Sequence, residues 1–254
     1  MNTWASCRFL YVLVVGLACG TLPVAATGAG GPLPALPRFS VADGGRLPPP
    51  WRVIGLPKNK VALTQFGIVD LEGERVLRVA SDRSYGNLTH ELADLNLEAQ
   101  ATLRWKWRLE QPLPGADLRR KDGDDVALKV CALFDMPLDR LGWVERNLLV
   151  LARKVSGEHL PSATLCYVWD NHLPAGTVQP NVYTRRVRYM VLNSGDAQQR
   201  QWITHERRLA MDFLLAFGSE TDSVPPLIAI VVGADSDNTG GTSLGFVGDI
   251  AMKQ

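Results

Sequence analysis

The segment Thr102-Leu-Arg-Trp-Lys-Trp-Arg-Leu109 decides the fold. Apolar side chains stand at positions 103, 105, 107 and 109, and basic side chains stand at 104, 106 and 108. Successive side chains of a β-strand point to opposite faces of a sheet, so this alternation predicts a strand with one buried and one solvated face. Trp105 and Trp107 share the apolar side with leucines, and we expect both rings in a hydrophobic core.

Other strands follow on both sides of this segment. Asp125 to Phe134 is apolar on both faces except at Lys129, which is typical of a central strand buried on both sides. Glu72-Gly73 predicts a hairpin turn. Further apolar or alternating runs predict strands over 61–69, 75–81, 163–169, 186–193, 227–233 and 243–252.

Two segments have helical rather than strand spacing. Leu209 to Phe217 is one of them, and Gly218 follows it as a helix C-cap. In the other, apolar residues stand at 141, 144, 148, 151, 152 and 155. Many strands with only two helices predict a mainly β fold, a jelly-roll β-sandwich with two short helical insertions.

The N-terminus carries an export signal. Residues 1–26 hold one charge, Arg8, followed by an apolar run and the small residues Val24-Ala25-Ala26, which is the pattern of a cleaved signal peptide. The Gly/Pro-rich residues 27–37 then predict a linker, and 38–254 a single β-sandwich domain. We therefore expect a periplasmic or secreted protein with no transmembrane span in its mature form. An uncleaved anchor, or a lipoprotein that begins at Cys19, are the alternatives.

Composition and charge narrow the class of protein further. The chain has 254 residues, of which 46% are hydrophobic and 21% charged, and this excludes a disordered or disulfide-dense chain. Its net charge is +1, and removing the leader with Arg8 leaves 26 basic and 26 acidic residues. Nothing in this balance predicts a nucleic-acid partner.

Two cysteines remain after the leader is removed. Cys131 and Cys166 both lie in predicted strands, and an oxidising compartment allows them to form a disulfide. Each is also an ordinary small core residue. The sequence leaves both interpretations open, because it does not say whether the two strands are neighbours.

Asp235-Ser-Asp-Asn-Thr-Gly240 has the oxygen ligands and glycine turn of the front half of a calcium loop. Phe246 stands where an EF-hand would have its glutamate, so help must come from elsewhere in the chain. With Asp249, Asp235 and Asp237 predict a structural Ca²⁺ site, and no other cofactor is expected. A β-turn rich in Asp, Asn and Gly is the alternative.

Asp124 and Asp125 are adjacent carboxylates, and such neighbours raise one another's pKa. With Glu206 they are the candidate catalytic residues of an enzyme, because glycosidases use two carboxyls roughly 5–10 Å apart. The alternative that we favour pairs both aspartates with the basic residues of the alternating strand, Arg104, Lys106 and Arg108. The four histidines are scattered without zinc-site spacing.

Aromatic rings in loops predict a ligand site, because sugars stack on them. Trp169 lies at a strand end beside Asp170-Asn-His172, and Asn181 and Tyr183 follow in the next loop. These three, Trp169, Asn181 and Tyr183, are the candidate ligand-binding residues, with packing inside the protein as the alternative role.

The sequence resembles an uncharacterised bacterial family, domain of unknown function 3047. Where the family pattern has an Arg-Asn pair, this chain has Arg207-Arg208, so a role of that asparagine would be lost. The resemblance implies an exported protein and supplies no activity or cofactor. The matching stretches are L-R-W-K-W at 103–107, G-D-D-V-A at 123–127, F-D at 134–135, Y-V-W at 167–169, N-V-Y-T at 181–184, W-I-T-H-E-R at 202–207, D-F-L-L-A-F-G at 212–218, D-S-D-N-T-G at 235–240 and G-D-I at 248–250.

Phe39, Trp51 and the closing Asp249-Ile250 also resemble galactose-binding-like jelly rolls, some of which hold a structural calcium. The sequence as a whole predicts an exported non-catalytic β-sandwich module that binds a glycan or another envelope component. A polysaccharide-acting, glycoside hydrolase-like enzyme with paired carboxylates is the main alternative. An envelope assembly protein, which would expose a large apolar patch, is another.

Overall fold

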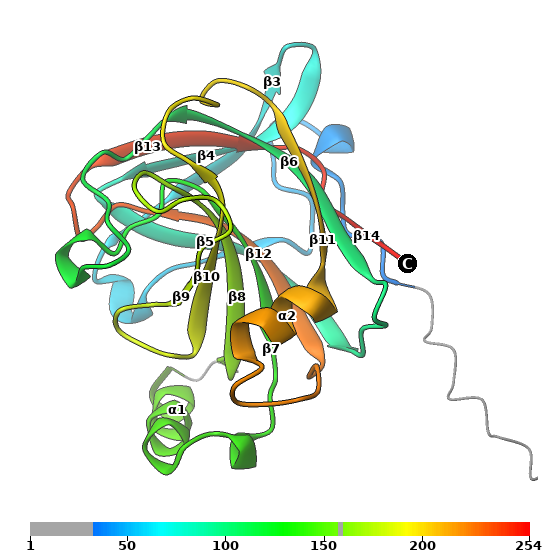
Figure 1. Cartoon of the computed structure of the whole chain (residues 1–254). Coiled ribbons are helices and arrows are strands. Elements are labelled where there is room, and N and C mark those ends of the chain that lie inside the picture. Colours follow the sequence, from blue (N-terminus) through cyan, green and yellow to red (C-terminus); the bar gives the residue numbers. More distant parts are fainter. Residues whose placement is uncertain (1–32, 157–159) are drawn as a thin grey trace, which may run out of the picture.

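The computed structural model describes residues 33–156 and 160–254, and within them two β-sheets pack face to face (Figure 1). The larger sheet has eight strands in the order β1-β5-β12-β7-β8-β10-β9, with β2 beside β5. Their bounds are β1 Arg52–Ile54, β2 Ala62–Leu63, β5 Ser84–Leu95, β7 Lys129–Phe134, β8 Ala163–Asp170, β9 Val178–Pro180, β10 Val187–Ser194 and β12 Leu227–Asp235.

The smaller sheet has six strands in the order β11-β6-β13-β4-β3, with β14 beside β6. Two α-helices, α1 Trp143–Ser156 and α2 Leu209–Phe217, lie at one end of the sandwich (Figure 1). The predicted mainly β jelly-roll sandwich with two helices is therefore confirmed. The bounds of these strands are β3 Gln65–Leu71, β4 Glu74–Asp82, β6 Thr102–Gln111, β11 Ile203–Arg208, β13 Thr242–Val247 and β14 Ala251–Lys253.

The alternating segment forms β6, and its apolar side faces the core between the sheets. Trp105 and Trp107 are buried, with ring centroids 5.7 Å apart, as the alternation predicts. The basic side chains of β6 pair instead with acids of the same sheet. Arg104 pairs with Glu206, Lys106 with Glu74, and Arg108 with Glu72 and Glu110.

Most predicted strands agree with the structure to within a few residues, but three do not. The strand predicted over 61–69 is divided at Thr64 into β2 of the larger sheet and β3 of the smaller sheet. The strand predicted over 125–134 begins only at Lys129, because Asp125 bonds to the loop after β12 and holds its own segment out of the ladder. The strand predicted over 243–252 is broken between β13 and β14. There Gly248 N–H donates to the Lys106 carbonyl, and the Asp249 carboxylate accepts bonds from Ser40 N and Oγ.

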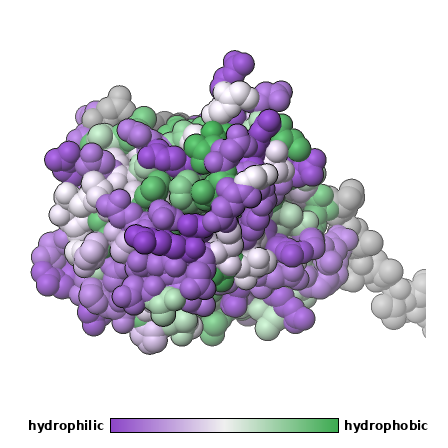
Figure 2. All heavy atoms as spheres, turned by 90° about the horizontal axis from the view of Figure 1, so that it is seen from above, coloured by the Kyte–Doolittle hydropathy of each residue, from purple (hydrophilic) through white to green (hydrophobic). Residues whose placement is uncertain are grey.

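The helical spacing correctly predicts both helices, yet the apolar stripe of α1 does not enter the core. Val144, Leu148 and Leu151 are exposed, while Leu149 is buried against the body of the protein. Within the described residues, no helix is long and apolar enough to cross a membrane. Seen from above, at the end opposite the helices, the surface is mostly hydrophilic with hydrophobic residues showing in between (Figure 2).

The predicted signal peptide, 1–26, lies outside the described residues, as does most of the predicted linker. The described end of that linker packs onto the sandwich. Leu36 is buried, and the Pro37 carbonyl accepts a 3.0 Å hydrogen bond from Trp51 Nε1.

Candidate ligand-binding groove

The outer face of the eight-stranded sheet is hollowed into a groove of about 1200 Å³. The strand register places its floor residues in rungs that run across the sheet. One rung consists of Thr89, Val231, Cys131, Cys166 and Tyr189, on β5, β12, β7, β8 and β10. Because β-strand side chains alternate, every second residue of these strands faces the groove and the others face the core.

Small side chains on the central strand create the hollow. Ala229, Val231 and Gly233 face outward on β12, and longer side chains on the neighbouring strands β5 and β7 flank Ala229 and Gly233. A Cβ at Gly233 would lie 2.5 Å from Asn87 Oδ1 and 2.9 Å from Lys129 Cε. A glycine at this position therefore lets an amide and an ammonium group approach each other across the sheet.

The groove has chemically different ends. Near α1 its lining is largely apolar, with Leu133, Leu148, Leu149, Leu160 and Pro161. At the opposite end the lining is polar and charged, and includes Tyr85, Asn87, Asp124, Lys129, Asp235 and Asp237. An elongated ligand in this groove would meet apolar contacts at one end and hydrogen-bonding groups at the other.

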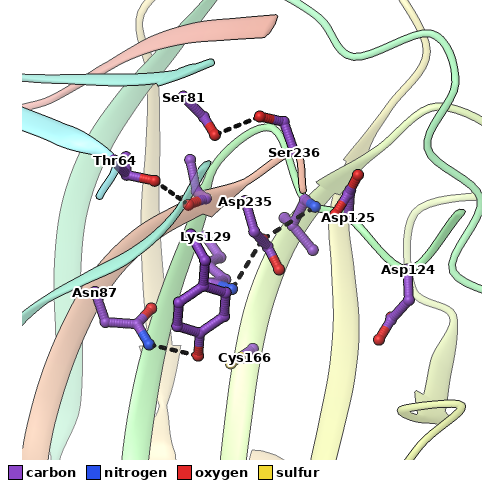
Figure 3. A network of polar contacts seen from close by, with 12 residues as sticks. Thr64, Ser81, Asn87, Asp124, Asp125, Lys129, Cys166, Asp235 and Ser236 are labelled. Carbon is purple, nitrogen blue, oxygen red and sulfur yellow. Dashed lines mark hydrogen bonds and ion pairs between the residues drawn. The ribbon is translucent and has the colours of Figure 1, made fainter. Parts of the chain in front are cut away.

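A buried ion pair forms the centre of the polar end (Figure 3). Lys129 Nζ lies 2.9 Å from Asp235 Oδ1, and both side chains are buried. The ammonium also lies 5.3 Å from the centre of the Tyr85 ring. Asn87 Nδ2 donates to the Tyr85 hydroxyl, while the buried Asn87 Oδ1 has no hydrogen-bond partner among the described residues. This amide oxygen is a buried acceptor at the polar end of the groove that the described part of the chain leaves unsatisfied.

A second group of polar side chains extends this end toward β9 and β10. Asp124 accepts hydrogen bonds from Asn181 Nδ2 and, at 3.3 Å, from the Tyr189 hydroxyl. Burial raises the pKa of Asp124, although both hydrogen bonds lower it. Tyr183 stands at the rim with its ring exposed and its hydroxyl bonded to the Lys121 carbonyl. The predicted residues Asn181 and Tyr183 thus lie together, and both line the groove.

Asp125, Asp235 and Asp237 offer carboxylate oxygens that lie within 4.8 Å of one another. Burial raises the pKa of Asp235 to about 6, against the opposing charge of Lys129. Burial and the neighbouring Asp125 raise the pKa of Asp237 as well. At this end of the groove a single buried lysine therefore faces several carboxyl groups that hold their protons more tightly than usual.

Several oxygens of these carboxylates are already engaged by hydrogen bonds or by the ion pair with Lys129. Both oxygens of Asp125 already accept hydrogen bonds, from Asn238 on one side and from Thr239 N–H and Oγ on the other. Asp235 Oδ1 accepts from Val126 N–H and from the Lys129 ammonium, a cation that would repel a second one. The third predicted ligand, Asp249, is bound to Ser40 instead. The structure therefore places Asp125, rather than the predicted Asp249, together with Asp235 and Asp237.

A disulfide lies in the groove floor. Cys131 of β7 and Cys166 of β8 are directly opposite in the antiparallel register, and their sulfurs are 2.07 Å apart. The register answers the question that the sequence leaves open, because it makes the two strands neighbours. The pair adds a rigid apolar surface beside Val231 and Tyr189.

Two other candidate residues lie elsewhere. Trp169 is buried in the core, where its Nε1 donates to the Gly195 carbonyl, because it sits at a position of β8 that faces inward. Glu206 lies on β11 of the other sheet, next to Arg104. The favoured pairing of Asp124 and Asp125 with Arg104, Lys106 and Arg108 is wrong for the same reason, since those cations are on the outer face of the six-stranded sheet.

Among the groove residues that sequence reasoning missed are Tyr85, Asn87, Lys129 and Tyr189. Tyr85 and Asn87 belong to β5, a strand that the sequence does not predict. Lys129 does carry a signal, because it is the one polar residue in an otherwise apolar run over 126–134. A lysine in a strand that reads as buried on both faces indicates either a buried ion pair or a functional site.

Two solved structures are similar to this chain at low sequence identity. One is the family 11 carbohydrate-binding module from Clostridium thermocellum, solved in complex with a β-1,3-1,4-mixed-linked tetrasaccharide. Its TM-score is 0.39 at 11% sequence identity, and the match covers 86% of this chain and 93% of that chain. Cellulose induced protein, Cip1, is similar with a TM-score of 0.36 and 10% identity over 80% and 90%. No curated protein matches the chain. The model of the family described as protein of unknown function (DUF3047) matches residues 49–251. Because this match spans most of the chain, the protein belongs to the DUF3047 family.

Proposed function

We propose that the protein is a non-catalytic binding module that holds a glycan in the groove on its eight-stranded sheet. The observation that carries this proposal is the groove itself, which joins an apolar floor to a cluster of fixed polar groups. Asn87, Tyr85 and Asn181 supply amide and hydroxyl groups that match the donor and acceptor pattern of sugar hydroxyls. The floor around Val231 and the disulfide offers apolar surface to the C–H faces of a sugar ring.

The charge of the polar end selects among glycans. Its acids, Asp124, Asp235 and Asp237, outnumber Lys129. An anionic polysaccharide would bring more negative charge to this end, and like charges placed together at low dielectric cost free energy. The groove therefore favours a neutral polysaccharide over an acidic one.

Affinity electrophoresis of the full chain against a panel of neutral and acidic polysaccharides tests this proposal. Thr89→Trp places an indole on the groove floor and should weaken retention at least tenfold. Thr204→Trp is the matched control, because Thr204 is an exposed residue of β11 on the other sheet. Equal binding by wild type and Thr89→Trp would contradict the proposal, as would a lack of retention by every polysaccharide.

A glycoside hydrolase-like enzyme is the second candidate, because the raised pKa values of Asp124, Asp235 and Asp237 favour it. All three line the groove, and a raised pKa is what a general acid requires. Asp237→Asn should then abolish release of reducing ends while retaining binding. Absence of hydrolysis by wild type on a polysaccharide that it binds would leave the non-catalytic module as the function.

Export is part of the proposal. The disulfide between Cys131 and Cys166 supports it, since such bonds persist in oxidising compartments. Cell fractionation should recover the protein outside the cytoplasm with its N-terminus near Thr27. Recovery of a full-length, reduced protein from the cytoplasm would contradict this part.

A further inference from the structure

Exposed apolar side chains gather on the helices rather than on the strands. Of the twelve large apolar side chains that are exposed among the described residues, eight lie on α1 and α2. On α1 five of them define the α1 stripe, in which Val144, Leu148 and Leu151 follow helical spacing and Trp143 and Val150 lie to one side. Their exposed fractions run from 46% for Val150 to 79% for Trp143. A surface of this kind on a folded protein normally marks an interaction site.

The stripe faces outward because the opposite side of α1 is fixed to the sandwich. Glu145 lies 3.2 Å from Arg186, and Arg153 Nη2 lies 2.9 Å from Asp135 Oδ1. Arg153 Nε also donates to the Leu160 carbonyl, and Leu149 is buried beside these pairs. Rotating the helix to hide its leucines would break both ion pairs and expose Leu149.

The charges beside the stripe indicate the kind of partner. The exposed charged residues of α1, Arg146 and Lys154, are both basic, and exposed Asp139 and Arg140 precede the helix. In the described part of the chain, Arg140, Arg146 and Lys154 have no ion-pair partner. Two copies of this protein meeting through α1 would bring these bases together, so a second copy is a poor occupant. An apolar helix face with a tryptophan and flanking bases instead matches the interface of an anionic lipid bilayer.

We propose that α1 docks on the surface of a membrane that contains anionic phospholipid. The stripe enters the interface between headgroups and acyl chains, and Arg140, Arg146 and Lys154 contact lipid phosphates. Trp143, the most exposed of the apolar side chains, lies at headgroup level. This surface is separate from the polar end of the groove, and of the stripe residues only Leu148 also lines the apolar end of the groove.

Co-sedimentation with vesicles tests the inference. The full chain should bind vesicles of phosphatidylcholine with about one-third phosphatidylglycerol at low salt, and at least tenfold more weakly to pure phosphatidylcholine or at high salt. Leu148→Ser should reduce binding about tenfold or more, because burial of a leucine is worth more than the free energy of a tenfold change. Arg146→Glu with Lys154→Glu should remove the preference for the anionic lipid.

Leu63→Ser is the matched control, since Leu63 is an exposed leucine on β2, paired with Tyr85 at the end of β5 away from α1. It should bind vesicles like wild type. Three outcomes would overturn the inference: no binding of the full chain to anionic vesicles, binding that Leu148→Ser leaves unchanged, or a dimer in sedimentation equilibrium that Leu148→Ser dissolves.

Discussion

Gly233 shows how one residue shapes the candidate site. It lies on β12 directly between Asn87 of β5 and Lys129 of β7 in the strand register. Any side chain there would meet the Asn87 amide, the Lys129 stem and the Gly86 carbonyl at 3.0 Å or less. The polar end of the groove thus depends on a missing Cβ in a central strand, where glycine is otherwise unfavourable.

We expect Gly233→Ala to destabilise the fold by about 1–3 kcal/mol, because the methyl group forces neighbours apart. It should also weaken ligand binding in the groove. Gly67→Ala is the matched control, since a Cβ at Gly67 of β3 meets nothing within 4 Å. That change should be neutral or stabilise by about 0.5 kcal/mol. Urea unfolding of the two variants checks the prediction, and equal stability would contradict it.

The buried ion pair predicts an asymmetry between its partners. Asp235→Asn leaves the Lys129 ammonium buried without its partner, and should cost about 3–5 kcal/mol. Lys129→Met should cost less at neutral pH, because Asp235, whose pKa burial already raises to about 6, can take up a proton. The double variant, Asp235→Asn with Lys129→Met, should lose less unfolding free energy than the two single variants lose in total. Denaturant unfolding of all four proteins measures this, and additive effects would show that the pair is not coupled.

At the scale of elements, β7 and β8 are joined by both their ladder and the disulfide. Cys131 and Cys166 are 35 residues apart, and α1 lies in the loop that they close. Closing a loop of this length restricts the unfolded chain, so the bond should contribute about 2–4 kcal/mol.

A reductant should therefore lower the melting temperature of the wild-type protein. The Cys131→Ser, Cys166→Ser double variant should melt near the temperature of the reduced wild type, and the reductant should not change it. Calorimetry with and without dithiothreitol makes the comparison. A reductant-sensitive melt of the double variant would contradict the role assigned to this bond.

The elements also show where sequence patterns succeed and fail. Strong alternation in β6 and continuous apolar runs in β8 and β12 predict strands correctly, because burial alone fixes those patterns. β5 was not predicted, although it is the longest strand, since Tyr85, Asn87 and Glu91 give its groove face a loop-like polarity. Sequence reasoning also misses the strands β1, β9 and β11, but β5 is the longest of the missed strands, and its polar residues line the candidate site.

At the scale of the whole molecule, pH acts on the core through His205. Burial, and to a smaller extent the charge of Arg207, lower the pKa of His205 to about 4. Its Nε2 lies 2.8 Å from Asn193 Oδ1. Its ring packs against the rings of Trp105 and Trp107, at centroid distances of 5.4 Å and 5.1 Å. In the unfolded chain this histidine takes up a proton near pH 6.5, whereas in the folded protein it stays neutral at that pH. The stability from the neutral ring is therefore complete above that pH, and is lost as the pH falls toward 4.

Between pH 7 and pH 4 the wild type should lose about 2 kcal/mol more stability than His205→Gln, allowing for the partial exposure of the ring. Asp235 acts in the opposite direction, because its raised pKa makes the folded state bind the extra proton between pH 4 and 6. Urea unfolding at several pH values separates the two contributions. Parallel pH profiles for the wild type and His205→Gln would contradict the assignment to His205.

A chelator tests the carboxylate cluster in the whole protein. The hydrogen bonds of Asp125 and the Lys129 ammonium already satisfy much of the cluster. We therefore expect the melting temperature to stay unchanged with EDTA and with added Ca²⁺. A melt that falls with EDTA and recovers with Ca²⁺ would show instead that these carboxylates hold a metal.

The sequence by itself determined the local features of this protein: the period of two in 102–109, the helical spacing of α1 and α2, and the composition of a folded, nearly neutral chain. These follow from short-range geometry, because the side-chain period of a strand or helix is fixed by its own backbone.

Only the tertiary structure decided which residues meet. Strand register brought Cys131 to Cys166 and Lys129 to Asp235, and the same register placed Trp169 in the core and Glu206 on the other sheet. The fixed inner side of α1 turned its apolar stripe to solvent. Such contacts join residues far apart in the chain, and local spacing carries no information about which strands become neighbours.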